Sequence, residues 1–313
     1  ISIRLVGSEM CIRDRGRAMN ATGTGITGGD PMLDMEKSLE AVKQLKAAFG
    51  PQHHIHLYTS IPFDPAHSKR FADAGLDEIR FHLLDGKLSR YIEVIDECSS
   101  LGIDVGIELP CEPDKSEDLF ALLDEMDGTS VKFLNLNELE ITVGNQENMD
   151  VRGFNLSGGM TAAAEGSFEL AIELKEYAKG MSFHVKFCTA SFKDAGQLRA
   201  RFRRRAEVTL RPYEIISSDD TILFGAIPTD ENDARDDMID LSNHLDLSEG
   251  WIRYDPIARR IELPLSAAET IAEHLSVQVQ LVEIHPTHER LEVSVVNLNL
   301  SLIHISEPTR RIE

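Results

Sequence analysis

Short apolar runs alternate with longer segments of helical periodicity through the first two thirds of the chain. The runs of strand length cover residues 23–27, 54–59, 78–84, 104–109, 131–136 and 182–189. The segments of helical periodicity cover residues 33–49, 66–74, 87–101, 115–127, 166–178 and 194–208. Strands that alternate with helices indicate a parallel sheet. We therefore expect an α/β protein whose sheet is either open or closed into a barrel.

The pattern changes after residue 206, where strand-length runs are joined by tight turns. Predicted strands cover residues 208–216, 221–227, 251–254, 260–263, 277–284 and 291–296. Predicted helices cover residues 232–245 and 265–275. Hairpins mixed with helices are typical of a small α+β domain. The sequence therefore predicts a main domain over residues 16–206 and an accessory domain over residues 207–299.

The two ends of the chain resemble translated sequencing adapter rather than natural protein. Residues 5–15 resemble one strand of a transposon-based adapter, and residues 300–310 resemble the same adapter read from its other strand. We therefore treat residues 1–15 and 300–313 as non-native and leave them out of the fold, as one would a cloning scar. They are expected to form tails. The natural sequence between them is expected to be a fragment that is cut at its N-terminus.

Composition narrows the partners of the protein. The net charge of −21 disfavours nucleic acid and anionic membranes. No apolar run approaches the roughly 18 residues of a membrane span. Outside the adapter-like ends, Cys98, Cys111 and Cys188 show neither a disulfide framework nor a zinc motif. Reduced thiols in a cytoplasmic protein are expected.

Polar residues end several of the predicted strands. The carboxyl ends of parallel strands meet at one edge of a sheet, which is where α/β folds bind ligands. The glycines after the first run let a ligand approach the backbone closely. Taken singly, each residue also has an ordinary explanation, such as a βα turn, a structural histidine or a helix cap. The candidate binding residues are Thr27, Gly28, Gly29, Asp30, Pro31, Thr59, Ser60, His82, Glu108, Asn135, Asn137 and Glu138.

These motifs resemble a known family. Thr27-Gly28-Gly29-Asp30-Pro31 is similar to the GGE-type motif that ends the second strand of radical S-adenosylmethionine (SAM) enzymes. Tyr58-Thr59-Ser60 stands where many of them carry TNG. Residues 106–110, 135–140 and 187–194 are similar to uncharacterised archaeal members related to pyruvate formate-lyase activating enzyme.

The resemblance implies a partial (βα)₆ TIM-like barrel that here lacks its first strand. It implies that the loop Gly28–Asp30 holds the amino group of SAM. It places Ser60, Glu108 and the segment 135–138 near the ribose, adenine or carboxylate of SAM. The small-molecule or protein substrate is left open.

In the family, a CxxxCxxC loop after the first strand holds a [4Fe–4S] cluster, which an electron donor such as ferredoxin or flavodoxin reduces. The cluster then cleaves SAM to a 5′-deoxyadenosyl radical. No CxxxCxxC stands in this sequence. We expect that loop within about forty residues upstream of Gly23, since a helix and two short connections fill such a span. The fragment is expected to be inactive without it.

Two other classes of protein fit the same residues. A barrel hydrolase or aldolase would use His82 and Glu108 as acid and base, and should carry a lysine or a metal triad at the strand ends. A non-catalytic binding protein is the third interpretation.

Overall fold

The computed structural model describes residues 2–3, 9–158, 161–275 and 277–299. It divides the chain into two compact units, each described by itself below. The first unit comprises residues 1–17 and 21–197, and the second comprises residues 18–20 and 198–313. The division thus falls before residue 198, whereas the sequence placed it after residue 206.

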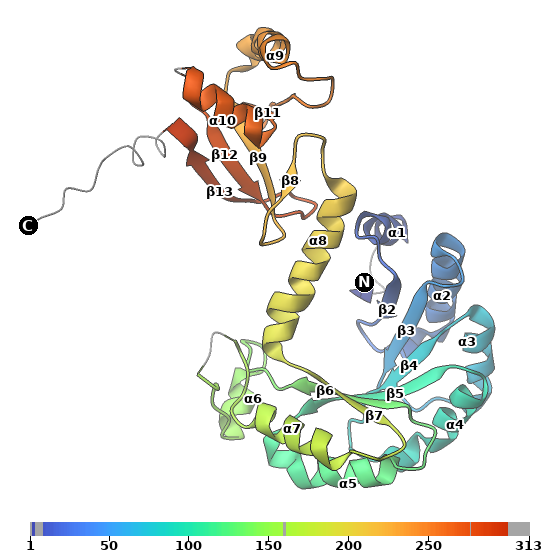
Figure 1. The fold of residues 1–313 in the computed structure, drawn as a ribbon. Coiled ribbons are helices and arrows are strands. Elements are labelled where there is room, and N and C mark those ends of the chain that lie inside the picture. The colour runs from blue at the N-terminus through green and yellow to red at the C-terminus, as the bar shows by residue number, and fades with distance from the viewer. Residues whose placement is uncertain (1, 4–8, 159–160, 276, 300–313) are drawn as a thin grey trace, which may run out of the picture. The chain divides into compact units, whose positions relative to one another are not determined.

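The first unit is built on a sheet in which every strand is parallel to its neighbour and strands follow in chain order (Figure 1). Each of the six predicted runs contributes a strand, which confirms an α/β protein with a partial TIM-like barrel. The strands are β2 (Gly23–Ile26), β3 (His54–Thr59), β4 (Glu78–Phe81), β5 (Asp104–Cys111), β6 (Phe133–Glu138) and β7 (His184–Cys188).

Helices connect these strands and lie along the outer side of the curving sheet (Figure 1). The α-helices are α2 (Met35–Phe49), α3 (Ser68–Ala74), α4 (Ile92–Ser100), α5 (Ser116–Met126), α6 (Gln146–Val151) and α7 (Ser167–Tyr177). Short 3₁₀ turns precede four of them, at η1 (Pro31–Asp34), η2 (Pro65–His67), η3 (Leu88–Arg90) and η4 (Pro113–Lys115). A π-helical turn, η5 (Phe192–Gln197), ends the unit.

The core of this unit lies between the sheet and the helices. Alternate strand residues such as Ile55, Leu57, Ile79 and Ile107 are fully buried there with apolar side chains of the helices. Because strand side chains alternate between faces, the other set of strand residues lies on the face away from the helices.

The N-terminal residues differ from the predicted tail. Ser2–Ile3 form β1, which pairs in parallel with Gly25 and Ile26 at the edge of the sheet. Residues Glu9–Ala18 form helix α1. Arg15 and Arg17 in its last turn suit the negative end of the helix dipole, so this segment is compatible with a helix. The expected tail at residues 300–313 lies outside the described residues.

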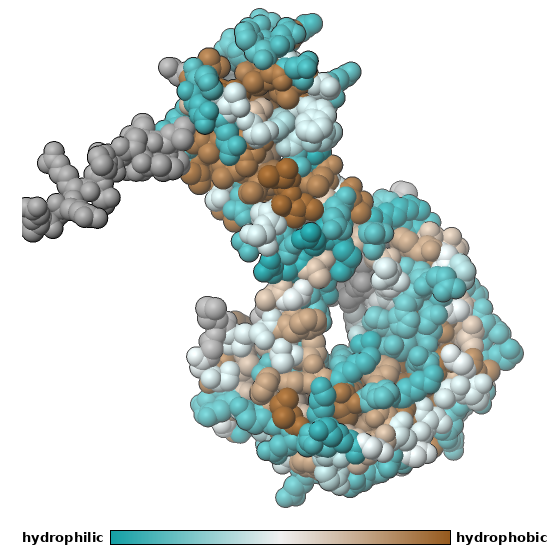
Figure 2. All heavy atoms as spheres, viewed as in Figure 1, coloured by the Kyte–Doolittle hydropathy of each residue, from teal (hydrophilic) through white to brown (hydrophobic). Residues whose placement is uncertain are grey.

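The second unit is an antiparallel sheet with helices, as its mixed pattern predicts. Its strand order is β10-β11-β9-β12-β13, with β8 paired to β9. The strands are β8 (Ile215–Ile216), β9 (Ile222–Pro228), β10 (Arg253–Asp255), β11 (Arg260–Leu263), β12 (Gln280–Ile284) and β13 (Glu292–Asn297). The helices are α8 (Leu198–Thr209), α9 (Glu231–Leu245) and α10 (Leu265–His274). Figure 2 shows hydrophobic surface on this unit. Strand β13 exposes Val293, Val295 and Val296.

The strand predicted at residues 208–216 is wrong over most of its length. Helix α8 continues to Thr209, and only Ile215–Ile216 pair as a strand. Tyr213 instead packs its ring into the core beside Phe224. Among the described helices of both units, none is long and apolar enough to cross a membrane.

Candidate functional site

The face of the first sheet that points away from the helices is polar, and we call it the inner face. Strand register brings its residues side by side: His56 lies opposite Glu78, Tyr58 opposite Arg80, and Glu108 opposite Asn135. Farther along the sheet, Asn135 lies opposite Lys186, and Asn137 opposite Cys188. A polar face on an otherwise apolar parallel sheet is a feature of a binding site, since such sheets are usually apolar on both sides.

Arg80 is the centre of the inner face. Its Nη1 donates to Glu108 Oε2 and to the Tyr58 hydroxyl, both at 2.9 Å, and its Nε donates to Glu78 Oε1 at 2.5 Å. Its guanidinium also lies 5.2 Å from the centre of the Tyr58 ring. Hydrogen bonds between charged groups are stronger than neutral ones, so Arg80 fixes both carboxylates in place.

Glu108 and Asn137, two of the predicted residues, are joined in this network. The Asn137 amide donates to Glu108 Oε1 at 3.0 Å. His82 is exposed, and its Nδ1 lies 3.0 Å from the main-chain oxygen of Glu108 rather than from the carboxylate. The acid and base pair that a hydrolase would need from His82 and Glu108 is therefore not formed.

Burial shifts the pKa values of two inner-face groups. Burial, with a smaller contribution from Glu108, raises the pKa of Tyr58 to about 12. Burial, together with the positive charge of Arg80, lowers the pKa of His56 to about 3. Both side chains are therefore neutral near pH 7.

The loop after β2 is held by Asp30. Its Oδ1 accepts from the main-chain nitrogen of Met32 at 3.0 Å and from Thr59 Oγ1 at 2.7 Å. Its Oδ2 accepts from the main-chain nitrogen and the hydroxyl of Ser60, at 2.7 and 2.9 Å. Burial alone would raise the pKa of Asp30, but these hydrogen bonds outweigh it and hold the pKa below its usual range.

Asp30 thus fastens the glycine loop to the end of β3 and has no free oxygen lone pair left for a ligand. Gly28 and Gly29 have positive φ values of 92° and 64°, which glycine adopts without strain. The space where a side chain of Gly29 would start has no atom within 4 Å. What the loop offers a ligand is therefore its backbone.

The remaining predicted residues divide between the two faces. Asn135 lies on the inner face beside Glu108, and Thr27 is half-buried at the end of β2. Thr59 and Pro31 are buried, and Ser60 is occupied with Asp30. Glu138 points to the opposite face, where its carboxylate accepts from the main-chain nitrogen of Ala190 at 2.6 Å. Its place on the strand therefore makes it a structural residue.

Sequence reasoning missed the inner-face residues of the first half of β3 and β4. His54, His56 and Tyr58 alternate with buried residues along β3, as do Glu78 and Arg80 along β4. That period of two was present in the sequence and marks a strand with one polar face.

The three cysteines whose side chains the structure describes do not fit a [4Fe–4S] cluster. Cys98 and Cys111 are buried in the core on the helix side, and burial raises the pKa of Cys111 to about 12. Cys188 lies on the inner face, and burial raises the pKa of its thiol too. A cluster needs thiolates that converge on one point. These thiols are protonated and lie on opposite faces of the sheet.

The fold and site define a parallel partial barrel with a glycine loop and a polar inner face. No family model matches the chain. A protein of Methanocaldococcus jannaschii, whose provisional name is glycyl-radical enzyme activating enzyme, is 31% identical over 303 residues, covering 91% of this chain and 78% of that protein. The chain belongs to the radical SAM family, among the relatives of the glycyl-radical enzyme activating enzymes.

Solved structures resemble the chain more distantly. SuiB of Streptococcus suis shares 16% identity, with a TM-score of 0.41 over 67% of this chain and 46% of that one. 3-Dehydroquinate dehydratase of Geobacillus kaustophilus shares 9% identity, with a TM-score of 0.40 over 60% of this chain and 72% of that one. At these scores the sheet topology itself carries the fold assignment.

Proposed function

We propose that the first unit binds SAM at the carboxyl edge of its sheet, as part of an enzyme that generates a 5′-deoxyadenosyl radical. The parent protein acts on a glycyl-radical enzyme as its protein substrate and takes its electron from a donor such as ferredoxin or flavodoxin, in the cytoplasm. The membership of the chain in the radical SAM family supports this reaction class.

The observation that carries SAM binding is the charge of the Arg80 network. It holds two carboxylates, Glu78 and Glu108, against one guanidinium. SAM carries a sulfonium and an ammonium group against a single carboxylate. A partly buried site with a surplus carboxylate attracts such a cation, because desolvation strengthens the attraction.

The proposed contacts follow from the donors and acceptors that remain free. Carbonyl groups of Gly28 and Gly29 accept from the SAM ammonium, while Asp30 keeps the loop in position. Glu108 and Asn137 bind the ribose hydroxyls, which can donate to a carboxylate and accept from an amide. Asn135, beside them, contacts the adenosine.

The [4Fe–4S] cluster of the family supplies the electron that cleaves SAM. Because the described thiols do not fit it, we assign that step to no residue of this chain. The proposal is that a three-cysteine loop preceding Gly23 in the natural protein provides the thiolates. Anaerobic iron reconstitution of a chain that includes this native segment should then yield 5′-deoxyadenosine from SAM, and a product without iron would contradict the proposal.

SAM binding by the present chain tests the site without the cluster. Equilibrium dialysis with labelled SAM should show Glu108→Gln weakening binding at least tenfold, which corresponds to about 1.4 kcal/mol. The matched control is Glu125→Gln, which removes an exposed carboxylate from α5. Circular dichroism should show both variants folded.

Two results would overturn the site. One is that SAM fails to bind the purified chain at millimolar concentration. The other is that Glu108→Gln binds SAM as well as Glu125→Gln does.

A further inference from the structure

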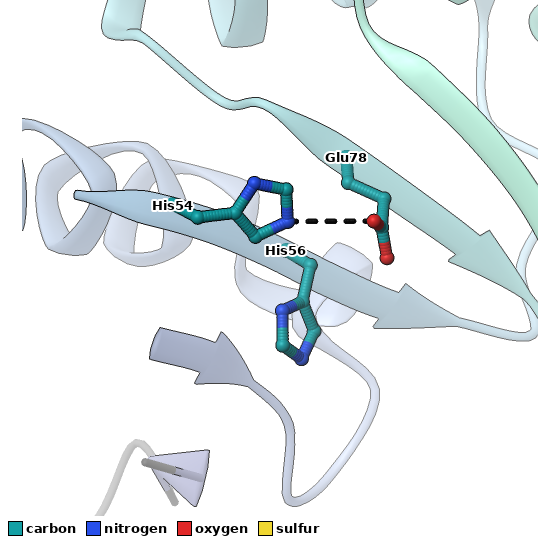
Figure 3. Close-up of side chains that lie close together, drawn as sticks. All are labelled: His54, His56 and Glu78. Carbon is teal, nitrogen blue, oxygen red and sulfur yellow. Dashed lines mark ion pairs between the residues drawn. The ribbon is translucent and has the colours of Figure 1, made fainter. Parts of the chain in front are cut away.

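Two histidines and a carboxylate meet at the amino-terminal half of the inner face (Figure 3). His54 and His56 come from β3, and Glu78 from the start of β4. One ligand atom from each lies within 4.8 Å of the others. His54 Nε2 is 3.3 Å from Glu78 Oε2. The cluster precedes Arg80 along the sheet, shares Glu78 with the Arg80 network, and lies apart from the carboxyl edge where SAM is proposed to bind.

One buried nitrogen of His56 lacks a hydrogen-bond partner within the described part of the chain. Its Nδ1 is buried and unpaired among the described residues. A buried polar atom without a partner costs about 1–3 kcal/mol, so native proteins rarely keep one unless a ligand or ion uses it. Gly25 makes room for this ring, since a Cβ there would lie 2.5 Å from His56 Nε2.

The two carboxylate oxygens of Glu78 face different neighbours, Arg80 and His54. Its Oε1 accepts from Arg80 Nε at 2.5 Å, and its Oε2 faces His54. A carboxylate that is oriented by a second hydrogen bond is a common arrangement beside metal ions, because that bond fixes the direction of the free oxygen. Arg80 also brings a positive charge close to the site, which lowers its affinity for a dication.

We propose that His54, His56 and Glu78 form a binding site for a first-row transition metal, with Zn²⁺ the best-fitting ion. Imidazole nitrogens and one carboxylate select such ions over Mg²⁺ and Ca²⁺, which prefer oxygen ligands. Zinc with three protein ligands keeps a fourth position for water. His54, with 46% of its side chain exposed, leaves that position open to solvent. The bound ion joins the starts of β3 and β4.

The geometry needs only a small closure to hold the ion. Bonds of about 2.0–2.1 Å place the ligand atoms of a tetrahedral site roughly 3.4 Å apart. The separation between His54 and Glu78 already matches this value. A rotation of the His56 side chain, whose Nδ1 makes no hydrogen bond to the described residues, completes the set.

The test is a competitive titration of the chelator-treated chain with Zn²⁺ in the presence of a chromogenic chelator. The wild-type chain should bind one equivalent. His54→Ala and His56→Ala should each weaken that binding at least tenfold. His184→Ala is the matched control, because it removes an exposed histidine at the start of β7, and it should bind as the wild type does.

A second pair of measurements separates this site from the thiols and from misfolding. Cys188→Ser should bind Zn²⁺ unchanged, and Co²⁺ in the wild type should show the intense visible absorption of a four-coordinate ion, which His56→Ala loses. Circular dichroism checks that each variant is folded. A stoichiometry below one half, or equal affinity in His56→Ala and His184→Ala, would overturn the proposal.

Discussion

Each unit of the molecule contains an arginine network made of the same kinds of side chain. In the first unit, Arg80 donates to the Tyr58 hydroxyl and to Glu108. In the second, Arg211 donates to the Tyr213 hydroxyl and to Glu262, both at 2.8 Å. Arg260 also pairs with Glu262, and Arg290 pairs with Glu214.

The two networks differ in exposure and in balance. Among the carboxylates, Glu78 and Glu108 leave 11% and 19% of their side chains exposed, whereas Glu262 and Glu214 leave 2% and 0%. In the second unit three carboxylates (Glu214, Glu262 and Glu292) face three guanidiniums (Arg211, Arg260 and Arg290). A balanced network has no surplus charge to attract a cation. A network with a surplus carboxylate attracts one, which is why we place the ligand site in the first unit.

The largest effect is expected from Glu262→Gln in the second unit. It leaves the guanidiniums of Arg211 and Arg260 without their shared buried partner, which typically costs about 3–5 kcal/mol. Urea unfolding followed by Trp251, the single tryptophan of the chain, reports on this unit. SAM binding should not change.

Glu289→Gln is the control for Glu262→Gln, since Glu289 is an exposed residue of the same unit. It should shift the unfolding free energy by less than about 0.5 kcal/mol. Equal loss in the two variants would show that burial does not distinguish the second network.

The sequence was sufficient to predict six strands of the parallel sheet. It was not sufficient to predict which residues form the two arginine networks. Strand β3 has the predicted bounds, because His54–Thr59 alternates polar and apolar residues. The meeting of Arg80 with Glu108 and Tyr58 depends on strand register, which no local pattern contains. Glu138 was predicted from its polarity alone, while the alternation of faces turns its side chain to the other side of the sheet from Asn137. The strand predicted at residues 208–216 is wrong for a related reason: a local pattern did not show that helix α8 extends to Thr209.

The second-largest effect is expected at Asp30 in the first unit. Both of its carboxylate oxygens already accept hydrogen bonds, as do the carboxylates of the second network. Asp30→Asn places an amide against the donors of Ser60 and removes charge-assisted hydrogen bonds, a loss of about 1.5–3 kcal/mol. Thermal unfolding measures that loss. Because the loop would no longer be fixed to β3, SAM affinity in equilibrium dialysis should fall as well.

The pH dependence of this effect has a definite sign. The folded-state pKa of Asp30 is below its model-compound value of 3.8, so its stabilising contribution is present above about pH 4 and is lost as the pH falls through the folded-state pKa. The control is Asp34→Asn, which removes the charge of an exposed helix-capping residue and leaves an amide oxygen to accept from Lys37. If Asp30→Asn leaves both stability and SAM affinity at the level of this control, the anchoring role of Asp30 is wrong.

The smallest expected effect tests how well the Arg80 network excludes water from the Tyr58 hydroxyl. Tyr58→Phe removes one hydrogen bond from Arg80 and should cost about 0.5–1.5 kcal/mol. The raised pKa of Tyr58, about 12, means that the folded chain holds the phenol proton more tightly than the unfolded chain does. The contribution is therefore complete below about pH 10 and disappears as the pH rises toward 12. Ultraviolet difference titration should show that Tyr58→Phe removes an ionisation near pH 12, whereas Tyr177→Phe, which removes an exposed tyrosine paired with Asp124, leaves it in place. If Tyr58→Phe instead removes an ionisation near pH 10, the usual value for tyrosine, water reaches the Tyr58 hydroxyl freely. The Arg80 network would then be more exposed to water than its contacts indicate.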